Sequence, residues 1–211
     1  MRKTIGPILL LSLFMLTCKS SNDGGEIPKR PPLRDIEAIQ ERGTLKILTE
    51  NGAVSFYKYK DKYLGFEYDI LDTFARSIGV ELEVEMISNP EDFVRKLNSY
   101  EGDIIACNKP ITMSSKELHA FSLPYNHSFQ VLVQRNDPDS IIRDISELKN
   151  KSLHIRNKSA FVKRILHLED EIGANIDLQT LPNYPIAEDL IEKVSNGEID
   201  FTIAMENTAR I

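Results

Sequence analysis

The feature that most constrains the fold of this chain is a regular alternation of short apolar segments with amphipathic ones from about residue 34 onward. Apolar content and a period of two predict strands at residues 45–48, 80–87 and 103–106. Between them, residues 66–78 carry an apolar stripe at helical spacing, and the pair Asn89-Pro90 begins a second helix. This strand–helix–strand–helix–strand order predicts a parallel sheet with right-handed crossovers.

The second half of the chain repeats this logic. Predicted strands lie at residues 129–134, 153–156, 176–181 and 199–204, and predicted helices at residues 159–171 and 185–196. The strand near residue 130 joins the halves, so the sequence predicts an α/β fold with two lobes, residues 34–133 and residues 134–211. In such folds ligands lie between the lobes, at the C-terminal ends of the strands.

The first 17 residues have the pattern of a signal peptide. Arg2 and Lys3 precede an apolar stretch of about twelve residues, shorter than the roughly 20 residues of a membrane-spanning helix. Cys18 follows and begins a Ser-, Gly- and Pro-rich predicted tether over residues 18–33. A Cys in this position resembles the lipobox of bacterial lipoproteins, which implies lipidation of Cys18 and anchoring to a membrane of the cell envelope, with the periplasmic side of the outer membrane expected. The alternative is an ordinary secretory peptide with an incidental Cys.

Composition excludes several classes of function. The formal net charge is −6, from 26 basic and 32 acidic residues, and the chain has no Trp, so we expect no nucleic-acid partner. Cys107 is expected to be a small buried hydrophobe rather than a nucleophile. The four His have no metal-ligand spacing, and we find no phosphate-binding loop, dinucleotide fingerprint or nucleophile elbow. The sequence therefore predicts no metal, no cofactor and no catalytic residue in this chain.

Several motifs in combination resemble a known family. The series RGTLKILTENG, LGFEYDILDTFARSIGVELEVE and GDIIACNKPITMSSKELHAFSLPY resembles the family 3 extracellular solute-binding proteins. Within that superfamily, IQERGTLKIL, SFQVLVQR and LIEKVSNGEIDFTIA are similar to the N-terminal, non-catalytic domain of the membrane-bound lytic murein transglycosylase F family. The resemblance covers roughly residues 34–211 and implies a two-lobed, periplasmic-binding-protein-like fold of type II.

The transglycosylase likeness also implies a catalytic domain after the binding domain. Such a domain would need a general-acid Glu within an E-S motif, because cleavage of a glycosidic bond protonates the leaving oxygen. This chain has no such motif. In the family pattern, the strand after G-E-I-D leads to a second crossover that completes the first lobe. We therefore expect a fold that is incomplete at its C-terminus.

The same resemblance bears on the ligand. In amino-acid-binding members, an Arg three residues after the turn Thr clamps the ligand carboxylate, and Ser115 occupies that position after Thr112. An acid after the late strand binds the ligand amine in those members; Met205 stands there, with Glu206 one residue later. Both halves of the clamp are altered, which argues against a free amino acid as the ligand.

Polar and aromatic residues in the loops after the predicted strands remain as candidates for ligand binding. They are Glu50, Asn51, Phe56, Tyr57, Asn108, Lys109, Thr112, Ser115, Asn157, Ser159 and Glu206. The turn at Asn108-Lys109 is favoured because the C-terminus of a strand opens into the cleft in this fold. Ser159 begins a predicted helix, where free backbone amides suit an anion, although it and Asn157 could simply cap that helix. Phe56 and Tyr57 could equally serve lobe packing.

These features predict a cell-envelope lipoprotein whose solute-binding-like module closes on a small peptide-like or peptidoglycan-derived ligand. Two alternatives stay open. One is a truncated peptidoglycan lytic transglycosylase that lacks its catalytic domain, and the other is an amino-acid-binding component of a transporter. A third and weaker alternative is an interaction scaffold that has lost ligand binding.

Overall fold

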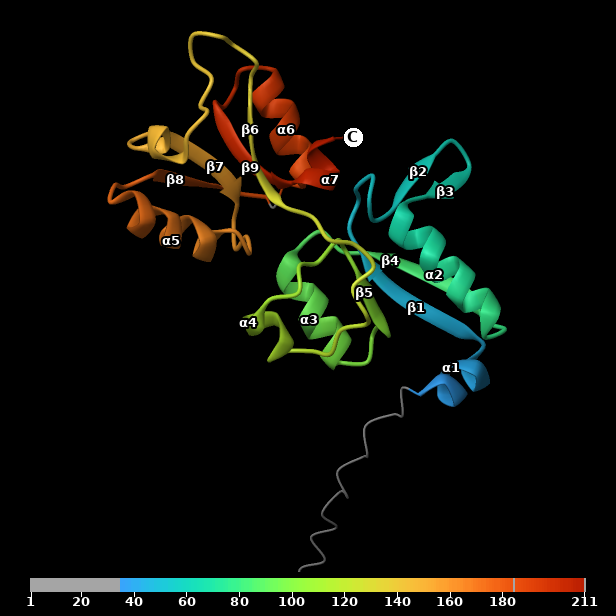
Figure 1. Cartoon of the computed structure of the whole chain (residues 1–211). Helices are drawn as coiled ribbons and strands as arrows, with labels where there is room; N and C mark the ends of the chain where they lie inside the picture. Colours follow the sequence, from blue (N-terminus) through green and yellow to red (C-terminus); the bar gives the residue numbers. More distant parts are fainter. Residues whose placement is uncertain (1–34, 184, 211) are drawn as a thin grey trace, which may run out of the picture. The chain divides into compact units, whose positions relative to one another are not determined.

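The computed structural model describes residues 35–183 and 185–210 (Figure 1). The predicted signal peptide, the tether over residues 18–33 and the lipidation site at Cys18 lie outside the described residues. Across the described ranges, none of the helices combines the length and the apolar character needed to cross a bilayer.

The first lobe contains the parallel sheet that the sequence predicts. Its strands are β1 (Thr44–Thr49), β4 (Glu81–Met86) and β5 (Ile104–Ala106), in the order β4-β1-β5 with both pairs parallel. The helices are α1 (Ile36–Arg42), α2 (Phe66–Ser77) and α3 (Pro90–Asn98). Asn89 caps α3, as expected, because its side chain accepts a hydrogen bond from the backbone N of Glu91 at 3.1 Å. The prediction of a parallel α/β unit is therefore confirmed.

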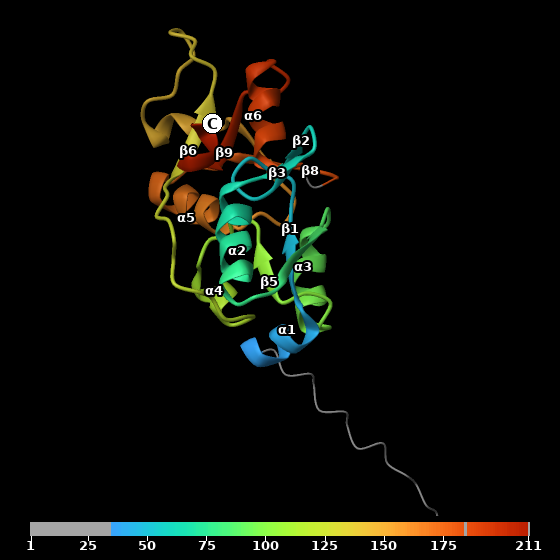
Figure 2. The same ribbon diagram turned by 90° about the vertical axis from the view of Figure 1, so that its right-hand side faces the viewer.

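Strand β1 lies at the centre of this lobe and contributes to apolar cores on both faces of the sheet. On one face Leu45 and Ile47 pack with Ala75 of α2, and on the other Leu48 packs with Phe93 of α3. The helices α2 and α3 accordingly flank the strands on opposite sides (Figure 2). Burial on both faces is typical of a parallel sheet covered by crossover helices.

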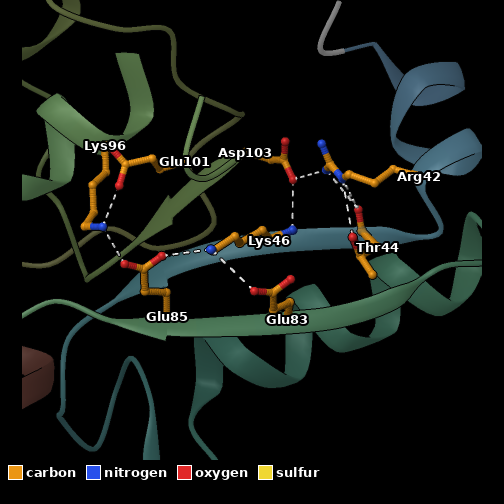
Figure 3. A network of polar contacts seen from close by, with 8 residues as sticks. All are labelled: Arg42, Thr44, Lys46, Glu83, Glu85, Lys96, Glu101 and Asp103. Atoms are coloured by element: carbon orange, nitrogen blue, oxygen red, sulfur yellow. Dashed lines mark hydrogen bonds and ion pairs between the residues drawn. The ribbon is translucent and has the colours of Figure 1, made fainter. Parts of the chain in front are cut away.

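A group of charged side chains, here called the polar network, joins several elements of the first lobe (Figure 3). Lys46 of β1 contacts Glu83 at 3.4 Å and Glu85 at 3.0 Å, both on the neighbouring strand β4. Lys96 of α3 in turn contacts Glu85 at 2.7 Å and Glu101 at 2.7 Å. The hydrogen bond from Lys96, followed by that from Lys46, lowers the pKa of Glu85 below its ordinary value.

The same network anchors the loop that leads into β5. The carboxylate of Asp103 accepts a hydrogen bond from the backbone N of Lys46 at 2.8 Å and forms an ion pair with Arg42 at 2.5 Å (Figure 3). Every carboxylate of the network thus faces at least one cation. Glu101, in the loop before β5, joins the network through its ion pair with Lys96.

Two small elements were not anticipated. Strands β2 (Tyr57–Tyr59) and β3 (Lys62–Leu64) form an antiparallel hairpin, and α4 (Met113–Lys116) is a single turn of helix. The hairpin leads into Gly65, whose φ is 142°. A Cβ at this position would lie 2.3 Å from the carbonyl oxygen of Ser55, so only glycine allows the loop after β1 to pack on the start of α2.

The second lobe has a mixed sheet of four strands. These are β6 (Gln130–Gln134), β7 (Ser152–Arg156), β8 (Asp177–Leu181) and β9 (Phe201–Met205), in the order β6-β9-β7-β8. Strand β6 runs antiparallel to β9, whereas β7 is parallel to both β8 and β9. Every residue of β6 pairs with β9, so the expected lobe boundary between residues 133 and 134 falls within a strand of the second sheet.

The second lobe also contains one 3-10 helix and three α-helices. They are η1 (Ile145–Leu148), α5 (Val162–Ile172), α6 (Ala187–Ser195) and α7 (Glu206–Ala209). The buried side chains of Leu153 and Ile155 from β7 pack with Ile165 and Leu168 from α5. The prediction that Ser159 caps this helix was wrong. The helix begins at Val162, and the Ser159 hydroxyl accepts instead from the backbone N of Phe161, in the turn before it.

Candidate functional site

Residues of both lobes line one cavity of about 350 Å³. The first lobe contributes the loop after β1 (residues 50–52), the turn after β5 (residues 107–110) and the segment around α4. The second lobe contributes the turn after β7 (residues 158–161), the start of α6 and the end of β9. The cavity therefore lies where β1, β5, β7 and β9 end, as the strand order predicts.

Most of the sequence-predicted site residues come together here. The candidates that line the cavity are Glu50, Asn51, Asn108, Lys109, Thr112, Ser115 and Ser159. The candidates that are not among the lining residues are Phe56, Tyr57, Asn157 and Glu206.

Three of the candidates outside the cavity, Phe56, Tyr57 and Glu206, belong to local structure within their own lobes. Phe56 is 4% exposed and packs against Tyr63 and Tyr68, with ring centroids 5.4 and 5.5 Å away, so this aromatic ring serves packing within the first lobe. Tyr57 begins the hairpin strand β2. The carboxylate of Glu206 pairs at 2.7 Å with Arg210, one helical turn later in α7. Met205, directly before Glu206, lines the cavity.

Thr112 and Ser115 are engaged with each other. The Thr112 hydroxyl accepts from the backbone N of Ser115 at 3.1 Å, and the Ser115 hydroxyl accepts from the backbone N of Thr112 at 2.8 Å. This reciprocal pair is a capping box, and it begins α4. The hydroxyl at the position of the family's carboxylate-binding Arg is therefore used to hold the turn.

Beneath the turn after β5 lies a buried carboxylate that the sequence analysis did not single out. Glu67, in the first turn of α2, is 5% exposed, and its two oxygens each lie 2.9 Å from the backbone N of Asn108, which donates to them. The Tyr125 hydroxyl donates to the same carboxylate at 2.5 Å. Asn108 has a φ of 47°, so Glu67 stabilises a backbone conformation that few residues adopt. The sequence signal for this residue was the G-F-E-Y-D segment, in which Glu67 is the second residue of the predicted helix.

Burial dominates the electrostatics around Glu67. Desolvation raises the pKa of this carboxyl above 4.5, and the hydrogen bonds from Tyr125, Ser55 and Asn108 offset only part of that effect. Desolvation, followed by the hydrogen bond to Glu67, raises the pKa of the Tyr125 phenol, which is therefore a donor at neutral pH. Among the described residues Glu67 accepts hydrogen bonds from neutral donors and forms no ion pair, unlike the carboxylates of the polar network.

An ion pair between the lobes was also missed. Arg156, the last residue of β7, contacts the carboxylate of Glu50 at 2.8 Å, and each side chain is 19% exposed. Both residues line the cavity. Arg156 could have been found by the rule that selected Asn108, because it too stands at the carboxyl end of a predicted strand.

Three other contacts join the lobes beside the cavity. The carboxylate of Glu188, at the start of α6, accepts a hydrogen bond from the backbone N of Ala53 at 3.0 Å. The Asn108 side chain donates to the hydroxyl of Thr208 at 3.4 Å. Lys158 forms an ion pair with Glu91 of α3. Together with the Glu50–Arg156 pair, these polar contacts hold the two sheets around the cavity.

Cys107 lines the cavity but is poorly suited to nucleophilic chemistry. Burial raises the pKa of the Cys107 thiol, which keeps it protonated and weakly nucleophilic. It packs against the cluster of Leu48, Ile87 and Phe93. Among residues 35–183 and 185–210 there is no group of three or more His, Cys, Asp or Glu side chains placed to hold a metal ion.

Comparison with known proteins places this geometry in context. Residues 45–181 match the model of the bacterial extracellular solute-binding proteins, family 3. The membrane-bound lytic murein transglycosylase F of Desulfosudis oleivorans is 33% identical over 175 residues, which cover 83% of this chain and 38% of that protein. The protein of the same name from Methylobacillus flagellatus is 26% identical over 200 residues, or 93% of this chain and 40% of that protein. The chain spans about two fifths of the length of these relatives, and the similarity is to their N-terminal domain.

Solved structures share the fold at low sequence identity. The ancestral amino acid-binding protein AncCDT-1, a precursor of cyclohexadienyl dehydratase, has a TM-score of 0.71 at 20% identity, over 83% of this chain and 75% of that one. Holo ArgBP from T. maritima has a TM-score of 0.66 at 23% identity, also over 83% of this chain and 75% of that one. These likenesses confirm the two-lobed fold of type II.

Proposed function

The chain belongs to the bacterial extracellular solute-binding proteins, family 3, and on that premise we propose that it binds a small peptide-like or peptidoglycan-derived solute between its lobes. The observation that carries this proposal is the cavity itself, which both lobes line at the ends of their strands. A cavity of about 350 Å³ is at the lower end of the range for small-molecule sites. The peptidoglycan part rests on the name of the relatives, which are lytic murein transglycosylases.

The proposed mechanism is closure of the lobes on the solute. Asn108 illustrates how the site supports this, because its backbone N is held by Glu67 within the first lobe while its side chain reaches Thr208 in the second. A solute that makes its contacts only when both lobes surround it shifts the population toward the closed state. We also propose that the chain is located in the cell envelope, where a lipid at Cys18 anchors it to the outer membrane. The relatives are named as membrane-bound, which supports it.

A thermal-shift screen of the purified chain tests the proposal. Muropeptides, short peptides and the free amino acids would each be added at millimolar concentration. Because a solute that binds only the folded state stabilises it by mass action, a true ligand at 100 times its Kd is expected to raise the Tm by about 5–10 °C. Stabilisation by free amino acids alone would favour the transporter-component alternative, and the absence of any stabilisation would contradict solute binding.

A matched pair of variants locates the site. Lys109→Ala removes a cation that lines the cavity, whereas Lys151→Ala removes one from an exposed position that is not among the lining residues. The first substitution should weaken binding of an active compound severalfold, and the second should leave it unchanged. Equal effects of the two substitutions would place the binding site elsewhere.

A further inference from the structure

The ion pair between Glu50 and Arg156 joins the two lobes at the proposed binding site. Glu50 follows β1 in the first lobe, Arg156 ends β7 in the second, and both line the cavity. Their charged atoms are 2.8 Å apart, and each side chain is only 19% exposed. Because both charges are largely screened from water, the loss of either partner would leave the other charge uncompensated and poorly solvated.

The guanidinium of Arg156 is far from saturated. It carries five N–H donors, and Glu50 is its one hydrogen-bonding or ion-pair partner among the described residues. Its Nε atom is buried and has no hydrogen-bond partner in this part of the chain. A planar guanidinium binds a carboxylate best through two parallel hydrogen bonds. Arg156 therefore retains the capacity to bind a carboxylate other than that of Glu50.

The other charged groups that line the cavity determine what a ligand that displaces Glu50 would meet. Ser115 holds the turn at the position where a carboxylate-binding Arg is expected, so the first lobe offers no guanidinium there. Glu188 also lines the cavity and forms no ion pair with a described residue. Of the cations that line the cavity, Arg156 and Lys158 form ion pairs, and Lys109 forms none with a described residue. Displacement of Glu50 from Arg156 would leave two carboxylates, Glu50 and Glu188, facing the cavity.

We propose that Arg156 is the receptor for the ligand's carboxylate, and that Glu50 occupies it as an internal substitute until the ligand arrives. This inference rests on the proposed function, since it names the class of solute that the same cavity takes. Exchange of partners is favourable only when both freed charges find a counter-charge, so the ligand must also carry a cation for Glu50 or Glu188. The solute class is an amphoteric one, such as a short peptide with a free carboxylate and a free ammonium group.

Chemical rescue tests the receptor without knowledge of the natural ligand. Glu50→Ala removes the internal carboxylate and leaves space beside Arg156. Sodium acetate at 0.3 M should then raise the Tm of this variant by about 2 °C more than sodium chloride at the same ionic strength, because acetate binds the folded state alone. The double variant Glu50→Ala, Arg156→Gln should show no difference between the two salts, and neither should the wild-type chain. Equal responses of the single and double variants would overturn the inference.

A second measurement separates this inference from the proposed function. Trialanine, its C-terminal amide and its N-acetyl derivative would be titrated into the wild-type chain, alongside any compound that stabilises it in the screen. We expect the free peptide to bind at least tenfold more tightly than either blocked form, and Arg156→Gln, unlike Lys109→Gln, to abolish the preference over the amide. Binding that ignores the carboxylate and survives Arg156→Gln would refute the receptor while preserving solute binding. Acetate rescue without binding of any peptide or screened compound would refute solute binding while preserving Arg156 as a carboxylate receptor.

Discussion

The polar network of the first lobe and the cavity between the lobes use charge in opposite ways. In the polar network each carboxylate faces a cation, as Glu85 faces both Lys46 and Lys96. Next to the cavity, under the turn after β5, Glu67 is buried against neutral donors, and among the described residues the side chains of Glu50 and Arg156 pair only with each other. Saturated charges stabilise a fold but have nothing left to offer a ligand. Unsaturated charges cost stability and keep their capacity to bind, which is typical of functional sites.

The largest expected effect comes from the buried carboxylate. Glu67→Ala should lower the free energy of unfolding by about 2 kcal/mol, because the backbone N of Asn108 and the Tyr125 hydroxyl would lose their acceptor in a buried position. Urea unfolding followed by circular dichroism measures this loss. Glu83→Ala, in the exposed part of the polar network, is the matched control and should cost less than about 0.5 kcal/mol. Equal losses would remove the distinction between the two regions.

The ion pair between the lobes should show a smaller but specific coupling. Arg156→Gln leaves the Glu50 carboxylate half-buried without its cation, and we expect it to cost about 1–2 kcal/mol. In the double variant with Glu50→Gln the uncompensated charge is gone, so much of the stability should return. A double-mutant cycle by urea unfolding then gives a coupling near 1 kcal/mol, against less than about 0.5 kcal/mol for Lys46 with Glu83. Similar couplings in both cycles would show that the cavity pair is an ordinary surface pair.

The two regions should also respond to pH with opposite signs. The pKa of Glu67 in the folded state is raised above 4.5, so the folded state binds the proton more tightly than the unfolded chain does. The contribution of Glu67 is therefore fully present below pH 4.5 and declines as the pH rises through the folded-state pKa. The difference in unfolding free energy between the wild-type chain and Glu67→Gln should fall over that interval. A difference that rises with pH would mean that hydrogen bonding outweighs desolvation.

For Glu85 the pH dependence of stability has the opposite direction, and the expected effect is the smallest of those predicted here. Its folded-state pKa lies below 4.5, so its contribution is present above pH 4.5 and is lost as the pH falls through the folded-state pKa. The wild-type chain should exceed Glu85→Gln in stability by about 0.5 kcal/mol at pH 6, and the two should converge in acid. Urea unfolding at a series of pH values measures both carboxyl groups. A constant difference between the two proteins would show that Glu85 acts through packing rather than charge.

Much of the fold followed from the sequence because its signals are local. The apolar runs and periods predicted each strand of the two large sheets, and Asn89-Pro90 marked the start of α3 correctly. The weak points were short elements and helix starts. The hairpin of β2 and β3 has only three residues in each strand, too few for a period to show. At α5, Ser159 was misread because a serine before an apolar run fits both a cap and the turn that precedes one.

In the candidate site, too, local signals in the sequence predicted some features and tertiary packing decided the others. The sequence by itself determined which loops meet, since parallel strands end on one side of a sheet, and this selected Asn108, Lys109 and Ser159 for the cavity. Only the tertiary structure decided that Glu67 lies under the turn after β5 and that Glu50 meets Arg156. A hydrogen bond or ion pair between residues far apart in the chain depends on how elements pack, and no spacing within a segment records it. Local periodicity therefore places the site, and packing determines which of its charges are free to bind.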